Sequence, residues 1–271
     1  MNRQQIKLLA ITAMTIDHIA FIFVKPDTAL YYVMRFIGRM TAPIMTFMLV
    51  EGFRYTRSRS RYLLRLVAFA LISQPFYFRM LFGRAPTSAL EYVTHWNVMF
   101  SLAVALMSLM LLESKIPIVP RLILVGVCIS LAQFGDWSFM IPVWTIIFHV
   151  FRNDKRRCAA LFIIVSVVLQ TLIWLPQHDS LAAFSYQYGT LLALIPISMY
   201  NREQKSIIHC KLNKRFFYFF YPSHMTLRIY QNSNTVIHTN YVSYVQRAYQ
   251  GTYNRCECPS PPCGQRDVCL L

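Results

Sequence analysis

Long apolar runs separated by short polar stretches dominate the chain. Nine runs reach, or come close to, the roughly 20 residues that a helix needs to cross a bilayer. They cover residues 8–24, 34–53, 62–82, 98–112, 119–134, 139–151, 158–175, 181–200 and 216–229. The pattern predicts an all-α fold, a polytopic transmembrane helix bundle of about nine helices.

The character of the chain changes near Arg228. The following residues are polar and rich in tyrosine, and four of the seven cysteines (Cys256, Cys258, Cys263 and Cys269) gather at the end. We therefore predict a transmembrane domain at 1–229 and a polar tail at 230–271 that is disordered or non-native. The cysteine spacing matches structural zinc sites poorly, so no metal is expected.

The basic residues support a membrane topology. Only 14% of residues are charged, yet the net charge is +16. The basic residues sit in short clusters between apolar runs, so the expected partner is a lipid bilayer and not a nucleic acid. If the runs alternate sides, 18 Lys and Arg residues fall on one side and five on the other before the tail. This bias predicts a cytoplasmic N-terminus and a multi-pass protein of the bacterial inner membrane.

The first predicted helix carries polar residues where they are costly. Asp17 and His18 lie ~15 Å from its cytoplasmic start, and such residues generally face a bundle interior. His18 can accept and return a proton near neutral pH, which makes it the candidate catalytic base, with a packing role as the alternative. Lys7 shares its helix face about 16 Å away, at the cytoplasmic mouth.

The second predicted helix adds two candidates. Arg39 lies at a depth comparable to that of His18, so it either pairs with Asp17 or holds an anionic intermediate. Glu51 lies near the cytoplasmic end of the same helix. Arg39 is assigned to the candidate site, and Glu51 is kept as a further polar candidate.

Asn97 and His224 complete the polar candidates. Asn97 directly precedes an apolar run, where it either caps a helix or contributes to the site. His224 follows a run of aromatic residues, and Pro222 within that run can bend the helix and expose polar groups to a cavity. His224 is therefore an auxiliary catalytic candidate.

The densest basic cluster follows the second predicted helix. Its members Arg54, Arg57, Arg61 and Arg65 recur at three- and four-residue spacing and would form one stripe on a helix. Such a stripe suits phosphate groups, whereas the simpler interpretation is topology plus anionic lipid. No Walker loop, G-x-G-x-x-G or H-E-x-x-H motif is present, so nucleotide-driven transport, dinucleotide chemistry and zinc proteolysis have no support.

Ordered segments of the chain resemble the TraX family, the membrane acetylases named for the F-pilin of conjugative plasmids. The segments are Lys7-Leu-Leu-Ala-Ile, Ile16-Asp-His-Ile19, Ile37-Gly-Arg39, Ala42-Pro-Ile44, Glu51-Gly-Phe53, Arg65 with Gln74-Pro75, Asn97-Val-Met-Phe100, Gly135-Asp136, Tyr200-Asn201 and Phe220-Tyr-Pro-Ser-His224. The resemblance covers about residues 5–227 and does not extend to the tail.

The resemblance implies N-acetylation from acetyl-CoA, with pilin as the acceptor in the conjugative members. The spacing of Lys7 and His18 is also similar to the basic-x10-His signature of membrane acyltransferases that modify surface glycans. By that analogy His18 is the general base. Lys7 and the arginine cluster hold the CoA phosphates, and Arg39 and His224 are auxiliaries.

Two other functions stay open at this point. In an ion-coupled transporter or flippase, Asp17, His18 and Arg39 would form a relay that moves a substrate without any need for CoA. In a non-catalytic scaffold, the same charges would only lock helices together, and CoA would not bind.

Overall fold

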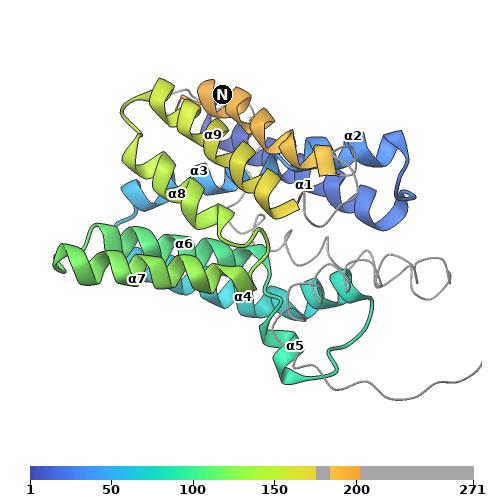
Figure 1. Ribbon diagram of the computed structural model, residues 1–271, viewed down its shortest axis with the longest axis horizontal. Helices are drawn as coiled ribbons and strands as arrows, with labels where there is room; N and C mark the ends of the chain where they lie inside the picture. The colour runs from blue at the N-terminus through green and yellow to red at the C-terminus, as the bar shows by residue number, and fades with distance from the viewer. Residues whose placement is uncertain (175–183, 202–271) are drawn as a thin grey trace, which may run out of the picture. The chain divides into compact units, whose positions relative to one another are not determined.

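A computed structural model describes residues 1–174 and 184–201, and within these ranges the chain is helical, with no β-strand (Figure 1). The α-helices are α1 (Arg3–Phe23), α2 (Ala29–Gly38), α3 (Thr41–Tyr55), α4 (Arg59–Phe82), α5 (Ala89–Val93), α6 (Val98–Leu112), α7 (Ile118–Leu131), α8 (Met140–Val150), α9 (Lys155–Trp174) and α11 (Leu194–Ser198). The 3₁₀-helices are η1 (Ala132–Phe134) and η3 (Ser185–Ala193). The prediction of an all-α bundle is confirmed.

The helices have the length and surface of a membrane protein. Four helical spans are long and apolar enough to cross a bilayer, namely Arg3–Phe23, Ala29–Tyr55, Arg59–Phe82 and Lys155–Ile173. Shorter apolar helices cover Val98–Leu112, Ile118–Phe134 and Met140–Val150. One face of α7 exposes Ile118, Leu122 and Ile123, each more than half accessible. An apolar outer surface of this kind suits contact with lipid acyl chains.

The predicted helix at 34–53 is in fact two helices, α2 and α3, with a break at Arg39 and Met40. Pro43 explains the break, because it has no N–H to donate to the carbonyl of Arg39 and thus cannot continue the α-helical ladder. The Met40 N–H also departs from the α-helical pattern, because it donates to the carbonyl of Ile37, three residues earlier, over 3.4 Å. The break places Arg39 at the junction of two helices.

Three smaller differences concern the other predicted elements. The run at 119–134 ends as η1, and the described part of the run at 181–200 forms η3 and α11. The short helix α5 was not predicted, because five residues are too few for a periodic pattern. The predicted helix at 216–229 and the tail at 230–271 lie outside the described residues.

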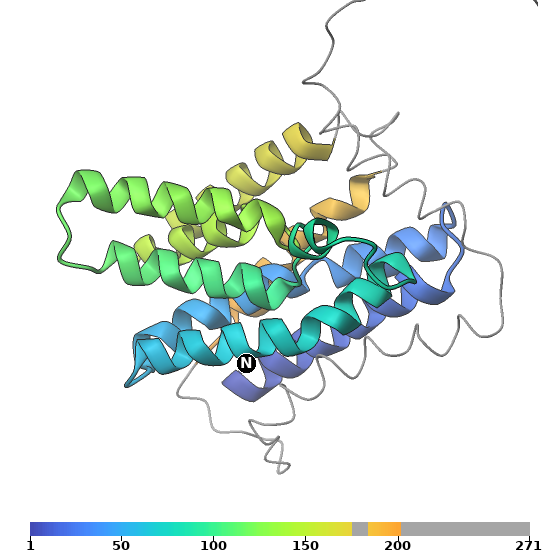
Figure 2. The ribbon, with the colours of Figure 1, turned by 90° about the horizontal axis from the view of Figure 1, so that it is seen from below.

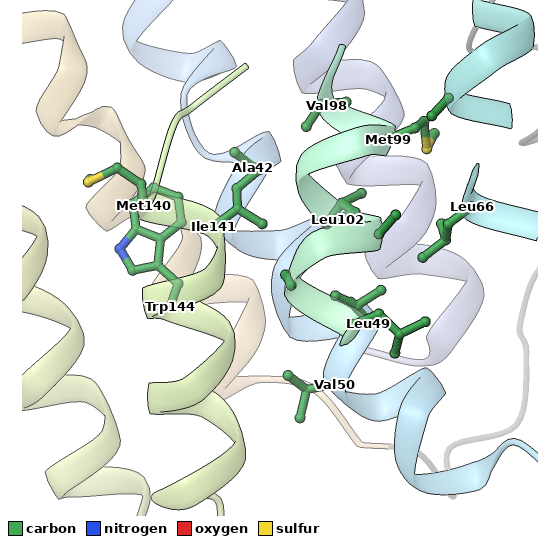
Figure 3. Close-up of a cluster of buried hydrophobic side chains, with 14 of the residues drawn as sticks. Ala42, Leu49, Val50, Leu66, Val98, Met99, Leu102, Met140, Ile141 and Trp144 are labelled. Atoms are coloured by element: carbon green, nitrogen blue, oxygen red, sulfur yellow. The ribbon is translucent and has the colours of Figure 1, made fainter. Parts of the chain in front are cut away.

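The main core is built around α6. Its residues Val98, Met99 and Leu102 lie among side chains of α3, α4 and α8, including Leu49 and Trp144 (Figure 3). Ten of the fifteen residues of α6 are buried, so this helix is apolar all round, as expected of a central element. The central position of α6 gives the neighbouring helices a rigid support.

Helix directions determine which ends meet. α6 and α7 run antiparallel and are joined by a short turn (Figure 2). α1 packs against α2 and α3, with Ile6 and Ala10 of α1 in one apolar cluster with Ile44 and Met48 of α3. The start of α1 therefore lies toward the C-terminal end of α3, and the later part of α1 lies beside α2.

Candidate functional site

The candidate site begins with two arginines one helical turn apart on α2. Arg35 and Arg39 are four residues apart, so their side chains share a helix face, and both reach Asp17 on α1. Nη1 of Arg35 donates to Oδ2 of Asp17 over 2.8 Å, and Nη2 of Arg39 lies 3.6 Å from Oδ1. The three side chains are only 10–15% exposed. The predicted pairing of Asp17 with Arg39 is confirmed, and Arg35 joins it as a second cation.

A glycine allows this close approach. A Cβ atom added to Gly38 would lie 2.3 Å from Cβ of Asp17 and 2.5 Å from its Oδ1. No side chain therefore fits at residue 38 unless α1 and α2 move apart. The glycine lets the acidic residue of one helix lie directly against the backbone of the other.

Aromatic rings enclose both guanidinium groups. The Arg35 guanidinium carbon lies 5.4–5.9 Å from the ring centres of Phe21, Tyr31 and Tyr186. The Arg39 guanidinium carbon lies 5.0 Å from a ring centre of Trp137 and 5.4 Å from that of Tyr186. Arginine binds well over aromatic faces, so these rings stabilise two cations away from water.

Tyr186 reaches both arginines because η3 packs directly on α2. A Cβ atom added to Gly189 of η3 would lie 1.9 Å from the carbonyl oxygen of Phe36. Backbone therefore meets backbone at this contact. The close packing brings Tyr186, which is distant in sequence, to the two arginines.

The loop between η1 and α8 supplies Trp137 and a fourth charge. The Trp96 N–H donates to the carbonyl of Phe134 over 2.7 Å, and the Asp136 N–H donates to the carbonyl of Trp96 over 2.8 Å. Oγ of Ser101 donates to the carbonyl of Asp136 over 2.7 Å. The backbone around Asp136 is therefore fixed on two sides.

Asp136 lies in the field of the charges on α1 and α2. Burial raises the pKa of Asp136 to about 6, with Arg39 and Arg35 lowering it and Asp17 raising it. Arg39 exerts the largest of these charge effects. Two carboxylates and two guanidinium groups from three elements thus form one group, which is called the charged centre below. Its residues are Asp17, Arg35, Arg39 and Asp136.

A second group of charges lies where the C-terminal ends of α3, α6 and α8 meet the start of α4. Glu113 pairs with Arg59 and also with Nε2 of His149, the latter over 3.3 Å. Phe53 contacts both partners of Glu113, since its ring centre lies 4.2 Å from the Arg59 guanidinium carbon and 5.8 Å from the ring centre of His149. This region, with the arginines between residues 54 and 65, is called the basic end below.

The predicted arginine stripe is wrong in its geometry. The helix is interrupted at 56–58, where Thr56 is extended and Ser58 caps α4 by accepting the Arg61 N–H over 3.4 Å. Arg54 therefore lies in the last turn of α3, Arg57 lies in the connection, and Arg61 and Arg65 lie on α4. Periodic spacing alone could not reveal this interruption, because a capping serine is compatible with the same pattern.

Individual members of the cluster differ in their surroundings. Arg54 pairs with Glu51 over 3.3 Å, and Arg65 lies 5.7 Å from the ring centre of Tyr62. Arg57 and Arg61 are exposed, and their guanidinium groups form no ion pair within the described part of the chain. These two arginines are thus the cations most accessible to an anionic ligand at the basic end.

Asn97 has the structural surroundings of a cap. Its Oδ1 accepts the Met99 N–H over 3.0 Å at the start of α6. Its Nδ2 donates to the carbonyl of Ala70 and to Oε1 of Gln74, over 2.7 and 2.9 Å. Of the two interpretations of Asn97, the capping one is confirmed, and the residue joins α6 to α4.

The remaining predicted residues are placed as follows. Lys7 and His18 lie on α1, eleven residues or about 16 Å apart along the helix axis. Both are partly exposed. His18 is adjacent in sequence to Asp17 of the charged centre. His224 lies outside the described residues.

Sequence reasoning missed three contributors to the centre: Arg35, Asp136 and Tyr186. The i, i+4 spacing of Arg35 and Arg39 was an available signal, but Arg35, at the start of the run at 34–53, was counted only among the five basic residues of the outer side. Asp136 stands as an acid between two apolar runs, which is also a usable signal. Tyr186 had none, because only the packing of η3 on α2 brings it close.

Comparisons with known proteins identify the family of this chain. A family model described as TraX protein matches residues 2–230. The chain is 31% identical over 233 residues to the probable fimbrial assembly protein FimC, serogroup H1, of Dichelobacter nodosus, an alignment covering 82% of this chain and 92% of that protein. No solved structure matches. The chain belongs to the TraX family.

Proposed function

We propose that this protein is a multi-pass acetyltransferase of the bacterial inner membrane that transfers an acetyl group from acetyl-CoA to the amino terminus of a pilin-like subunit. Membership of the TraX family and similarity to a protein named for fimbrial assembly support this choice of acceptor. A hydroxyl group of a surface glycan is the other acceptor that the acyltransferase analogy suggests.

The observation that carries the proposal is the state of Arg39. Its side chain is 11% exposed, its Nη2 lies 3.6 Å from Oδ1 of Asp17, and its buried Nε has no hydrogen-bond partner among the described residues. Acyl transfer passes through an intermediate whose carbonyl oxygen becomes negative. A preorganised cation with an unused donor, held away from bulk water, stabilises such an oxygen.

His18 is the proposed proton acceptor. The acceptor amine must lose a proton, its nitrogen then bonds the acetyl carbon, and the carbon–sulfur bond breaks. One proton goes to the departing CoA thiolate and one is released, so the reaction converts an ammonium and a thioester into an amide, a thiol and a proton. An imidazole near neutral pH performs both transfers well.

The basic end is the proposed binding site for the CoA phosphates. Arg57 and Arg61 are exposed there, and the guanidinium fork matches phosphate oxygens. The fifteen residues of α3 place this end about 22 Å from Arg39. The donor must therefore extend from the basic end along the bundle for its thioester to reach the charged centre.

The test uses the full chain in lipid nanodiscs with radiolabelled acetyl-CoA and a peptide copying the amino terminus of the host pilin. The expected result is transfer of label to the peptide by the parent protein and loss of transfer in His18→Ala. His95→Ala is the matched control, because it removes an imidazole from the loop before α6 that is not one of the four residues of the charged centre. Full transfer by correctly inserted His18→Ala would remove His18 from the mechanism.

An ion-coupled transporter is the second candidate, favoured by the same buried charges of α1 and α2. It predicts uptake of substrate into proteoliposomes without CoA. The acetyltransferase predicts labelled peptide without net transport, so one preparation assayed both ways separates the two functions.

A further inference from the structure

The backbone of the loop at 135–138 is more constrained than a simple connection requires. Trp137 and Ser138 have φ of 66° and 48°, in the left-handed region that side chains other than glycine rarely adopt. Residues in this region are strained, and strain of this kind gathers at functional sites. The surrounding packing must therefore hold the loop in this form.

The supports of the loop are specific. Trp96 bonds the backbone on both sides of Gly135, and Ser101 bonds the carbonyl of Asp136. A Cβ atom added to Gly135 would lie 2.2 Å from Oγ of Ser101, so a glycine is needed for this contact. These supports hold the strained loop so that Trp137 lies against Arg39. They also hold Asp136 where it feels the charges of the two arginines.

Asp136 and Arg39 interact electrostatically but do not form an ion pair. Arg39 is the charge that acts most strongly on Asp136, yet Asp136 forms no ion pair with any described residue. Arg35 and Asp17, in contrast, bond directly over 2.8 Å. The centre thus contains one closed pair, Arg35 with Asp17. We call Arg39 and Asp136 the open pair. Arg39 has only the longer 3.6 Å ion pair with Asp17, and Asp136, whose Oδ1 accepts the Trp137 N–H over 3.1 Å, has no ion pair among the described residues.

An amide-forming reaction needs that combination. The acetyl carbonyl oxygen needs a donor, which Arg39 supplies, and the N–H groups of the attacking amine need an acceptor, which a carboxylate supplies. We propose that Asp136 binds the amino group of the acyl acceptor opposite Arg39 and so positions it for attack. This assignment rests on the proposed function and adds to it the residue that recognises the acceptor.

The charge state of Asp136 then selects the acceptor. The charged groups facing it are Arg35 and Arg39 of α2 and Asp17 of α1, with His18 next in sequence to Asp17. When Asp136 is ionised, the four charges of the centre cancel and an ammonium group adds one favourable pair. When Asp136 is protonated, the centre is cationic and repels an ammonium, whereas a hydroxyl acceptor would be affected much less.

The test measures binding with no acetyl donor present, so it does not depend on turnover. The probes are two fluorescent peptides copying the amino terminus of the host pilin, one with a free amino group and one N-acetylated, added to the full chain in nanodiscs. We expect the free peptide to bind the parent protein about tenfold more tightly than the acetylated one at pH 7.5. This preference should decline as the pH falls through about 6, where Asp136 takes up a proton.

Two substitutions and a control sharpen the test. Asp136→Asn should remove the preference and its pH dependence, while Asp136→Glu should retain part of both. Asp154→Asn makes the same chemical change directly before α9, where Asp154 accepts the Arg157 N–H, and should behave like the parent. Thermal unfolding of each variant identifies any that is misfolded. If Asp136→Asn does not fold, the preference of Asp136→Glu is compared with that of the parent.

The outcomes separate the two proposals. An unchanged preference in folded Asp136→Asn, or a parent protein that binds both peptides equally, would overturn the assignment of Asp136. If the preference depends on Asp136 but no acetyl transfer occurs in the separate assay, the amine site stands and the acetyltransferase proposal fails.

Discussion

The charged centre and the basic end contain the same residue types but are built in opposite ways. At the centre, two arginines and two aspartates balance one another, rings cover the guanidinium groups, and glycines bring backbones together. At the basic end, arginines outnumber acids, and Arg57 and Arg61 are exposed. One region fixes charge in place, and the other presents charge to the surroundings.

The two regions are therefore suited to different tasks: the charged centre to stabilising a reacting group, and the basic end to attracting a polyanionic ligand. A preorganised and enclosed group stabilises charge that develops during a reaction, because no solvent must reorganise. Exposed cations attract a polyanion from a distance but hold it loosely, and salt screens them. The molecule therefore has one region suited to chemistry and one suited to binding phosphates, about 22 Å apart along α3.

The largest effect should come from the closed pair of the centre. Arg35→Gln leaves Asp17 without its 2.8 Å partner, and breaking a buried ion pair in this way costs about 3–5 kcal/mol. Arg39→Gln leaves that pair intact, so we expect a smaller change in unfolding but a loss of acetyl transfer of about 100-fold or more. Thermal unfolding in detergent and the transfer assay measure the two effects. Equal loss of stability in both variants would contradict the division into a closed and an open pair.

A glycine comparison should give the next largest effect. Gly38→Ala places a methyl group 2.3 Å from Cβ of Asp17, and overpacking of this kind costs about 1–3 kcal/mol. Gly126→Ala is the matched control, because nothing lies within 4 Å of its added Cβ on α7. The control should be neutral or more stable by about 0.5–1 kcal/mol, since alanine is the better helix former. If the unfolding temperature fell by the same amount in Gly38→Ala and Gly126→Ala, the contact of residue 38 with Asp17 would be unimportant for stability.

Removing exposed charge at the basic end should affect binding and not stability. For Arg57→Ala combined with Arg61→Ala we expect a change in unfolding free energy within about 0.5 kcal/mol. The KM for acetyl-CoA should rise severalfold at low salt and much less at high salt. Arg79→Ala, an exposed arginine near the opposite end of α4, is the control and should leave KM unchanged. A KM that is insensitive to both salt and substitution would place the CoA phosphates elsewhere.

The smallest effect concerns the loop before α5. Arg84 lowers the pKa of Glu91 to about 2, so the stability of this pair is present above the ordinary glutamate value and lost as the pH falls toward 2. The pair is partly exposed, so Glu91→Gln should cost no more than about 1 kcal/mol. At pH 7 we expect hydrogen exchange at residues 84–93 to be faster in Glu91→Gln than in the parent. At low pH the variant should show no further increase.

The sequence by itself determined the elements and their depth. Long apolar runs must be helical in a bilayer, because every backbone group needs an internal partner there. Depth along a helix follows from residue counting at 1.5 Å each, which is why Asp17 and Arg39 were expected to meet. The capping alternative for Asn97 was also available from its place before an apolar run. The roles of Lys7, His18 and the arginines toward a substrate stay predictions.

Only the tertiary structure decided which side chains share a site. Residue counting gives a height in the bundle but not the partner across it, and Asp17, Asp136 and Tyr186 are more than 100 residues apart from first to last. The interruption at Thr56 and Ser58 depends on hydrogen bonds that an arginine pattern does not encode. The charged centre arises because Gly38 and Gly189 let backbones approach and because the packing around Gly135 holds a strained loop. Contacts of this kind depend on the relative positions of distant elements, which hydrophobic periodicity does not specify.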